Sequence, residues 1–486
     1  MKPELRKISG ISPDQSLVLI TGKNEIPERI SLSQAEREYA LKQLEAGEGR
    51  VFINSYFKCT YIVRIKDGLS GYRAREELRK SAAGLKKLIK SNNHKELVIT
   101  SGNTYREAVA DFAEGLILSI YSFSKYKTKA EDEETGKNYP LSLLLEDSIT
   151  KSELKWLDAL TDAVYLARDL INEPVNRLNT AGLASEISRT GKEAGFSVEI
   201  FSKGKIEALK MGGLLSVNRG SVDPPAFCVL EWKPDSPVNS RPIVLVGKGV
   251  VYDTGGLNIK TGDYMAQMKG DMAGAAAVTG VFHTIARNNI PLYLVGLIPV
   301  TDNRPGGNAY AQGDIITMYN KMTVEIGNTD AEGRLILADA ISYASKYRPE
   351  LIIDVATLTG SAAITFGNKA IAMMTNADRK YTDLLAECGN QVYERVAGLP
   401  FYDEYKEAIK SEVADIRNIG GREAGAITAG KFLEHFAEFP IIHLDIAGTG
   451  ILKKDDHYRT KDGPGSGVRL LSVFLKRLSE TNNKIK

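Results

Sequence analysis

The segment Thr323-Val-Glu-Ile-Gly-Asn-Thr-Asp-Ala-Glu-Gly-Arg-Leu335 places a short strand, a polar turn and the start of a helix in direct succession. We predict the strand at residues 323–326 and the helix at residues 334–347. Between them, Asp330, Glu332 and Arg334 alternate, so in an extended chain their side chains would point to the same side. Two carboxylates held this close repel each other unless a cation lies between them.

A second set of charged residues lies upstream, among apolar runs and small residues. It consists of Lys248, Asp253, Lys260 and Asp271. With the downstream pair, four carboxylates supply the negative charge that two divalent cations neutralise. A solvated surface or a salt-bridge network is the usual explanation for any single pair of opposite charges. Unpaired burial of so many charges is expensive, so the pattern favours a two-metal hydrolytic centre.

The order of the expected elements indicates an α/β fold. Strands are expected at residues 18–20, 50–53, 61–65 and 96–100, and helices at 33–45, 75–91 and 104–123, the last of them amphipathic. Further strands are expected at 227–231, 242–246, 292–298, 351–355 and 441–445. These later runs are almost continuously apolar, as in central strands covered by helices on both faces. Several end at glycine turns beside the charged motifs, where open α/β sheets bind ligands.

Length and periodicity predict the domain organisation. A chain of 486 residues is too long for one compact core. We expect a smaller N-terminal α/β domain at residues 1–150 and a linker helix at 151–174. A larger catalytic α/β domain with a mixed central sheet is expected at 175–486. The polar run at residues 130–137 is expected to be a surface loop.

Composition excludes several classes of function. The formal net charge of +2 gives no support for a nucleic-acid partner. The N-terminus has no apolar signal region, and no stretch is long enough for a membrane span, so a cytoplasmic location is expected. The cysteines (Cys59, Cys228 and Cys388) form no C-x-x-C pair, and the five histidines form no HExxH pattern. Metal ions would therefore be bound mainly by oxygen atoms.

The octapeptide Asn328-Thr-Asp-Ala-Glu-Gly-Arg-Leu335 resembles the signature of the leucyl aminopeptidase family of dinuclear metallo-aminopeptidases. Further segments fall in the family's order and spacing: Gly247-Lys-Gly249, Tyr252-Asp-Thr-Gly-Gly256, Lys260, Met268-Lys-Gly-Asp-Met-Ala-Gly274, Arg304-Pro-Gly-Gly-Asn-Ala-Tyr310, Asp354-Val-Ala-Thr-Leu-Thr-Gly360 and His443-Leu-Asp-Ile-Ala-Gly448. The matches run from about residue 168 to the C-terminus. Residues 114–127 carry a looser match in the N-terminal third, where the resemblance implies a macro-like domain.

The resemblance implies a role for each charged residue. Asp253 and Glu332 would bridge two divalent ions, Mn²⁺ or Zn²⁺ with Mg²⁺ and Co²⁺ as alternatives. Asp330 would complete the more exchangeable site, and Lys248 and Asp271 the tighter one. A water bridging the ions would attack the peptide bond. Lys260 would stabilise the oxyanion, and Arg334 would hold a bicarbonate ion that serves as general base.

The resemblance also implies the substrate and the assembly. The substrates would be peptides with a free N-terminal amine, and the assembly a homohexamer. The substrate-binding residues would be Met268, Asn328, Thr357, Leu358, Gly360 and Ala447. The small and apolar members of this group suit leucine or methionine as the first residue, with a broad preference. Gly450, where some relatives carry a bulkier residue, would deepen the pocket.

Two other functions fit parts of the pattern. A regulatory or DNA-binding protein could be built on the same scaffold, although the complete set of charged residues argues against an inactive enzyme. A dinuclear-metal phosphoesterase also uses paired carboxylates, but that class usually recruits histidines, which are missing from these motifs.

Overall fold

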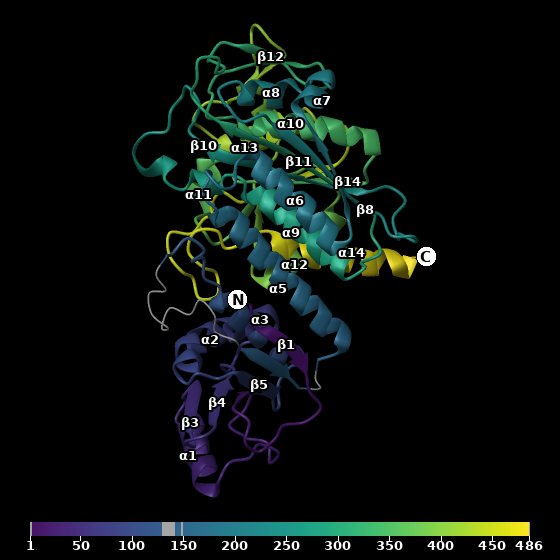
Figure 1. Ribbon diagram of the computed structural model, residues 1–486. Coiled ribbons are helices and arrows are strands. Elements are labelled where there is room, and N and C mark those ends of the chain that lie inside the picture. Colours follow the sequence, from purple (N-terminus) through teal and green to yellow (C-terminus); the bar gives the residue numbers. More distant parts are fainter. Residues whose placement is uncertain (1, 129–140, 147–148, 486) are drawn as a thin grey trace. The chain divides into compact units, whose positions relative to one another are not determined.

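The computed structural model describes residues 2–128, 141–146 and 149–485. The polar run expected to be a loop at residues 130–137 lies outside these ranges. The chain forms two compact units (Figure 1): an N-terminal unit of Met1–Tyr165 with Asp455–Thr460, and a C-terminal unit of Leu166–Lys454 with Lys461–Lys486. The boundary falls inside helix α5 (Lys151–Asn172).

A six-stranded sheet forms the core of the described part of the N-terminal unit, in the order β1-β6-β5-β2-β4-β3. All neighbouring pairs are parallel except β3 and β4. The strands are β1 (Glu4–Lys7), β2 (Leu17–Thr21), β3 (Arg50–Asn54), β4 (Cys59–Arg64), β5 (Glu96–Ser101) and β6 (Ser142–Leu145). Helix α1 (Gln34–Glu45) packs on one face, and α2 (Gly71–Ser91) and α3 (Ala108–Ile120) pack together on the other.

Helix α3 differs from its prediction in length and in burial. It begins at Ala108, four residues after the predicted start, and is buried around its whole circumference. The amphipathic interpretation was therefore wrong. The reason lies in Asp111 and Glu114, which form ion pairs with Arg75 and Arg79 of α2. Paired charges can be buried, so the polar residues of α3 did not mark a solvated face.

A mixed nine-stranded sheet forms the centre of the described part of the C-terminal unit, in the order β16-β15-β18-β14-β9-β11-β8-β7, with β10 beside β11. Strands β18, β14, β9 and β11 are parallel neighbours, and β8 and β15 run antiparallel to them. The strands are β7 (Ser197–Phe201), β8 (Ala226–Trp232), β9 (Ile243–Gly247), β10 (Gly249–Asp253), β11 (Leu294–Asn303), β14 (Leu351–Ala356), β15 (Ile371–Thr375), β16 (Val396–Gly398) and β18 (Ile441–Asp445). The predicted mixed sheet is confirmed.

Helices cover both faces of this sheet (Figure 1). One layer contains α6 (Thr180–Ala194), α9 (Ala273–Arg287), α12 (Arg379–Val392) and α14 (Val468–Ile485). The other contains α8 (Gly212–Asn218), α10 (Gly333–Ala344) and α13 (Gly425–Glu434). The core under α10 and α13 joins Val244 and Val246 of β9 to Leu335 and Phe432. A small sheet contains β12 (Ile315–Thr317), β13 (Thr323–Glu325) and β17 (Ile416–Arg417), and its strand β13 leads into the octapeptide.

The octapeptide is a turn rather than an extended chain, so the predicted alternation of side chains was wrong. Thr329 and Asp330 lie in a turn, Glu332 has helical dihedral angles (φ −77°, ψ −39°), and α10 begins at Gly333. The Oδ1 of Asn328 accepts the Asp330 N–H at 2.7 Å and closes the turn. The two carboxylates converge because the chain folds back, and not because they lie on one side of a strand.

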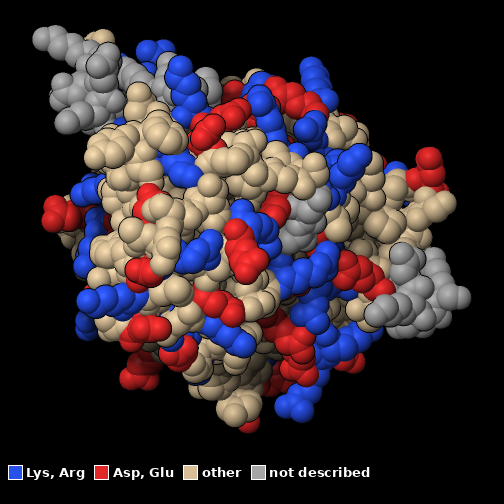
Figure 2. All heavy atoms as spheres, turned by 90° about the horizontal axis from the view of Figure 1, so that it is seen from below, with Lys and Arg blue, Asp and Glu red and all other residues tan. Residues whose placement is uncertain are grey.

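No helix in the described ranges is both long and apolar enough to cross a bilayer. On the face drawn in Figure 2, basic and acidic side chains are interspersed. Cys59, Cys228 and Cys388 are buried free thiols.

Candidate metal centre

The charged residues of the motifs converge at the carboxyl ends of parallel strands in the C-terminal unit. Lys248 lies between β9 and β10, and Asp253 is the last residue of β10. Asp271 follows a short 3₁₀ turn (Met268–Gly270), while Asp330 and Glu332 precede α10. Strand ends aim these side chains into one space, as is usual for ligand sites of open α/β sheets.

Three carboxylates, of which only Asp330 is partly exposed, form one half of the cluster. One oxygen from each of Asp253, Asp330 and Glu332 lies within 4.8 Å of the others. The Nζ of Lys260 is 2.8 Å from Asp253 and 2.5 Å from Asp330, whose side chain is 33% exposed. Burial and the charges of Glu332 and Asp253 raise the pKa of Asp330 to about 7. Burial alone would lower the pKa of Lys260, but these carboxylates raise it, so the amine is protonated at neutral pH.

Lys248 lies in the buried half of the cluster. Its Nζ is 2.7 Å from Asp271 Oδ2 and 2.9 Å from Glu332 Oε1, and it donates to the Thr357 carbonyl at 3.0 Å. The Thr357 hydroxyl donates to Asp271 Oδ1 at 2.8 Å. Burial opposes the charge of Lys248, but the neighbouring carboxylates raise its pKa above the ordinary value. Burial raises the pKa of Asp271.

This set of side chains fits divalent metal ions. Four carboxylates, three of them almost fully buried, face two lysines, so negative charge exceeds positive charge in a site of low solvent access. Two dications would balance the four carboxylates. Carboxylate oxygens and one amine nitrogen are donors that Mn²⁺, Zn²⁺, Mg²⁺ and Co²⁺ accept.

Close backbone approach at the cluster depends on glycine. A Cβ on Gly255, whose φ is +87°, would lie 2.3 Å from the Asn258 carbonyl oxygen. A Cβ on Gly333 would lie 2.4 Å from Cε of Lys248. Real Cβ atoms do not approach this closely, so larger residues would displace the loop or the lysine.

Sequence reasoning missed two asparagines that support the site. Asn303 donates to Asp253 Oδ1 at 2.9 Å and to the Thr329 carbonyl at 3.0 Å. The signal for Asn303 in the sequence was its position as a polar residue at the end of a long, mostly apolar strand. Asn418 accepts the N–H groups of Gly327 and Asn328 through its side chain. It lies far from the motifs in the sequence, and no local pattern marks it.

Arg334 is buried on the first turn of α10, and one of its nitrogen atoms is fully buried without a partner among the described residues. Its Nη1 donates to the Asn418 carbonyl at 2.7 Å, while its Nε has no hydrogen-bond partner among the described residues. Burial lowers the pKa of Arg334 to about 10, and the charges of Glu332 and Asp445 work in the opposite direction. The guanidinium is thus charged at neutral pH and can accept an anion.

The residues assigned to substrate binding lie in several loops of the C-terminal unit. Leu358 and Ala447 are joined because their N–H groups both donate to Asp445 Oδ1, at 3.1 and 3.0 Å. A Cβ on Gly450 would lie 3.0 Å from the Thr357 methyl, so these two residues are neighbours. Gly360 is the exposed first residue of α11 (Gly360–Phe366), and Met268 is half-buried in the 3₁₀ turn before Asp271. Asn328 uses its Oδ1 to close the turn at Asp330.

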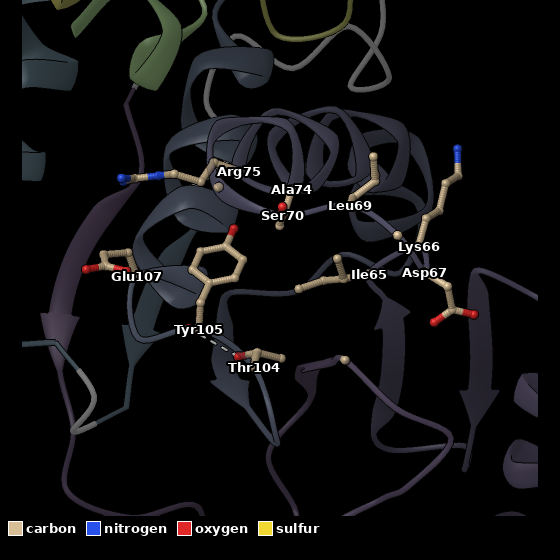
Figure 3. Close-up of a pocket in the computed structure, with 13 residues that line it drawn as sticks. Ile65, Lys66, Asp67, Leu69, Ser70, Ala74, Arg75, Thr104, Tyr105 and Glu107 are labelled. Atoms are coloured by element: carbon tan, nitrogen blue, oxygen red, sulfur yellow. Dashed lines mark hydrogen bonds between the residues drawn. The ribbon is translucent and has the colours of Figure 1, made fainter. Parts of the chain in front are cut away.

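A separate pocket of about 540 Å³ lies in the N-terminal unit (Figure 3). It is lined by the loops after β2, β4 and β5 and by the first turn of α2, including Ile65, Ser70, Ala74 and Tyr105. Its Arg75 is bound to Asp111 at 2.8 Å. Convergent titratable groups mark a catalytic site more strongly than volume does, so we assign the chemistry to the carboxylate cluster.

Comparisons with known proteins show the family of the chain. The model described as "Cytosol aminopeptidase family, catalytic domain" matches residues 165–472. A probable cytosol aminopeptidase of Chlorobium limicola is 43% identical over 384 residues, covering 76% of this chain and 75% of the relative. One of Chlorobium phaeobacteroides is 38% identical over 462 residues, covering 90% and 91%.

A solved structure has a fold similar to that of this chain. The bottromycin maturation enzyme BotP in complex with Mn matches with a TM-score of 0.83 and 27% identity, covering 96% of this chain and 100% of that one. The family model spans more than half of the chain, and the relatives are similar over most of their length. The chain therefore belongs to the cytosol aminopeptidase family of metallo-aminopeptidases.

Proposed function

We propose that this protein is a leucyl aminopeptidase-type exopeptidase that releases N-terminal residues, preferably leucine or methionine, from peptides. The observation that carries the proposal is the buried cluster of four carboxylates and two lysines at the carboxyl ends of the central strands. Family membership supports the general reaction class, and the residues of the cluster support the finer assignment.

The residues of the cluster divide into two metal sites. Asp253 and Glu332 would contact both ions, with Asp330 on the exposed side and Lys248 and Asp271 on the buried side. When bound, the ions (Mn²⁺ or Zn²⁺, with Mg²⁺ and Co²⁺ as alternatives) would supply a water nucleophile at neutral pH and polarise the peptide carbonyl. Lys248 would bind a metal ion only as the neutral amine, which has a free lone pair. A neighbouring dication would make this form available by lowering the pKa of Lys248.

Lys260 and Arg334 would act without binding metal. Lys260 is 14% exposed at the edge of the cluster and keeps a positive charge, which suits it to stabilise the oxyanion that develops on the carbonyl. The buried Nε of Arg334 has no partner in the described part of the chain, which suits Arg334 to hold bicarbonate, a base able to take up a proton during the reaction. The neighbouring Leu358, whose side chain lies near Gly333, would border the same anion.

The residues assigned to substrate binding favour an apolar side chain on the first residue of the peptide. Thr357, Ala447 and Gly450 are small and Met268 is flexible, so together they offer an adaptable apolar surface without a cation for an acidic side chain. Asn328 and Gly360 would border the bound peptide. We further propose a cytoplasmic homohexamer in which the domain at residues 1–150 contributes to assembly and access.

The test compares reaction classes on the purified protein with Mn²⁺. We expect hydrolysis of leucyl-anilide, its loss on chelation, and its return with Mn²⁺, Co²⁺ or Zn²⁺. Hydrolysis of an aryl phosphate without hydrolysis of the anilide would instead establish a phosphoesterase. Binding of DNA by a protein inactive on both substrates would support a regulatory function.

A further inference from the structure

The carboxylate of Asp445 joins the two loops assigned to the first-residue pocket. Asp445 ends β18 and is 1% exposed. Its Oδ1 accepts the N–H groups of Leu358 and Ala447, and its Oδ2 accepts the Thr359 hydroxyl at 2.7 Å. One side chain thus fixes the loop after β14 against the loop after β18. Three hydrogen bonds to one carboxylate form a rigid connection, since charged acceptors bind more strongly than neutral ones.

Other buried charged or titratable side chains lie near Asp445. His443 lies two residues earlier on β18, and its Nδ1 is 2.6 Å from Asp354 Oδ1 on β14. Burial opposes the charge of His443, but Asp354 and Asp445 raise its pKa. Burial lowers the pKa of Arg334, on α10, but Arg334 lies close enough for the charge of Asp445 to raise it. The positive charge of Arg334 lowers the cost of burying the Asp445 carboxylate.

The other end of the loop after β14 is held independently. The Thr357 carbonyl accepts from Lys248, and its hydroxyl donates to Asp271, so Thr357 is attached to the buried half of the cluster. Leu358 and Thr359 are instead held by their hydrogen bonds to Asp445. Loss of Asp445 therefore releases the pocket side of the loop and leaves its metal side in place.

We propose that Asp445 is a positioning residue that sets the shape of the first-residue pocket and so determines selectivity for large apolar side chains. The inference rests on the proposed function and deepens it, because it assigns selectivity to a residue that lies behind the pocket. Asp445 acts through the backbone of Leu358 and Ala447 and through the hydroxyl of Thr359.

Two substitutions separate the hydrogen bonds from the charge. Asp445→Asn keeps an oxygen for both N–H groups and offers an N–H to the Thr359 hydroxyl, so it preserves all three contacts without the charge. Asp445→Ala removes them. We expect Asp445→Ala to lower the ratio of kcat/KM for leucyl-anilide to that for alanyl-anilide roughly tenfold, within the range over which apolar pockets discriminate. Asp445→Asn should keep the ratio near that of the wild type, and both variants should keep their metal.

The matched control is Asp339→Asn. Asp339 is also a fully buried carboxylate of the C-terminal unit, and it accepts the N–H groups of Leu214 and Tyr319, both at 2.9 Å. Its substitution should lower stability and leave the ratio unchanged. If Asp445→Ala does not fold, Thr359→Val replaces it, with Thr359→Ser as the control that keeps the hydroxyl; only the valine variant should lower the ratio.

The outcomes distinguish the inference from the proposed function. An unchanged ratio in Asp445→Ala or Thr359→Val, an equal fall in Asp339→Asn, or loss of metal from Asp445→Ala would overturn the inference alone. A wild-type protein that cleaves neither anilide with Mn²⁺ would overturn the proposed function, and the inference with it.

Discussion

Glu332 and Lys260 lie in the same carboxylate cluster, but their replacement should have different effects. Glu332→Ala and Asp253→Ala should lose metal and activity together, and Mn²⁺ should no longer raise their Tm, since each residue would contact both ions. Lys260→Ala should keep its metal and lose about 2.7–4 kcal/mol of transition-state stabilisation, the contribution of an oxyanion donor. Elemental analysis and steady-state kinetics test this division. A Lys260→Ala protein without metal would contradict it.

The buried carboxyl group of Asp339 should make the free energy of unfolding decrease as pH rises. Burial raises its pKa to about 7 from an ordinary value of 3.8. Between these values the folded protein binds more protons than the unfolded chain, so this group's contribution to stability is lost as pH rises. Relative to Asp339→Asn, the wild type should lose up to about 1.4 kcal/mol per pH unit in this window. Urea unfolding of both proteins at pH 5 and pH 7 measures the difference; a constant difference would exclude a raised pKa.

The charged residues of the site were predictable from the sequence, and their supporting residues were not. Asp253, Asp330 and Glu332 stand out because burying like charges together is costly without a cation. Asn303 and Asn418 are neutral, and Asp445 was only part of a quoted motif. Their importance lies in hydrogen bonds to residues distant in sequence, such as that from Arg334 to the Asn418 carbonyl. The periodicity of apolar residues in a short stretch of sequence carries no information about such distant contacts.

At the scale of elements, the contact between α9 and β14 is unusually close. A Cβ on Gly274 of α9 would lie 2.0 Å from the Val355 carbonyl oxygen, which also accepts the Lys248 N–H at 3.1 Å. Gly274→Ala should therefore cost about 1–3 kcal/mol, as overpacking of a core does. Denaturant unfolding measures the loss, and Gly307→Ala, where the added methyl meets nothing within 4 Å, is the control. Equal stability of the two variants would refute close packing at Gly274.

The central strands were predicted and several outer strands were not. Strands β9, β14 and β18 are buried along their whole length and mostly apolar, because helices cover both faces of the sheet. Strand β1 has the sequence Glu-Leu-Arg-Lys and is mostly exposed at the sheet edge, so it lacks the apolar signal of a strand. The octapeptide was misjudged because side-chain hydrogen bonds, such as that of Asn328 to Asp330, close its turn.

At the scale of the whole molecule, we expect a homohexamer. The resemblance to leucyl aminopeptidases is the basis of this expectation, in which active sites open to an interior cavity and admit peptides or unfolded chain ends. Sedimentation velocity combined with activity assays of each species provides the measurement. A fully active monomer would contradict the proposed assembly and leave the chemistry of the site intact.

The central claim is that the carboxylate cluster serves a metal-dependent exopeptidase, which requires a free amine on the substrate. The most direct measurement is kcat/KM for leucyl-anilide and for its N-acetylated form, both with Mn²⁺ and after chelation. We expect hydrolysis of the free-amine substrate only, and only with metal. Equal hydrolysis of the acetylated substrate, or activity that survives complete removal of metal, would contradict it.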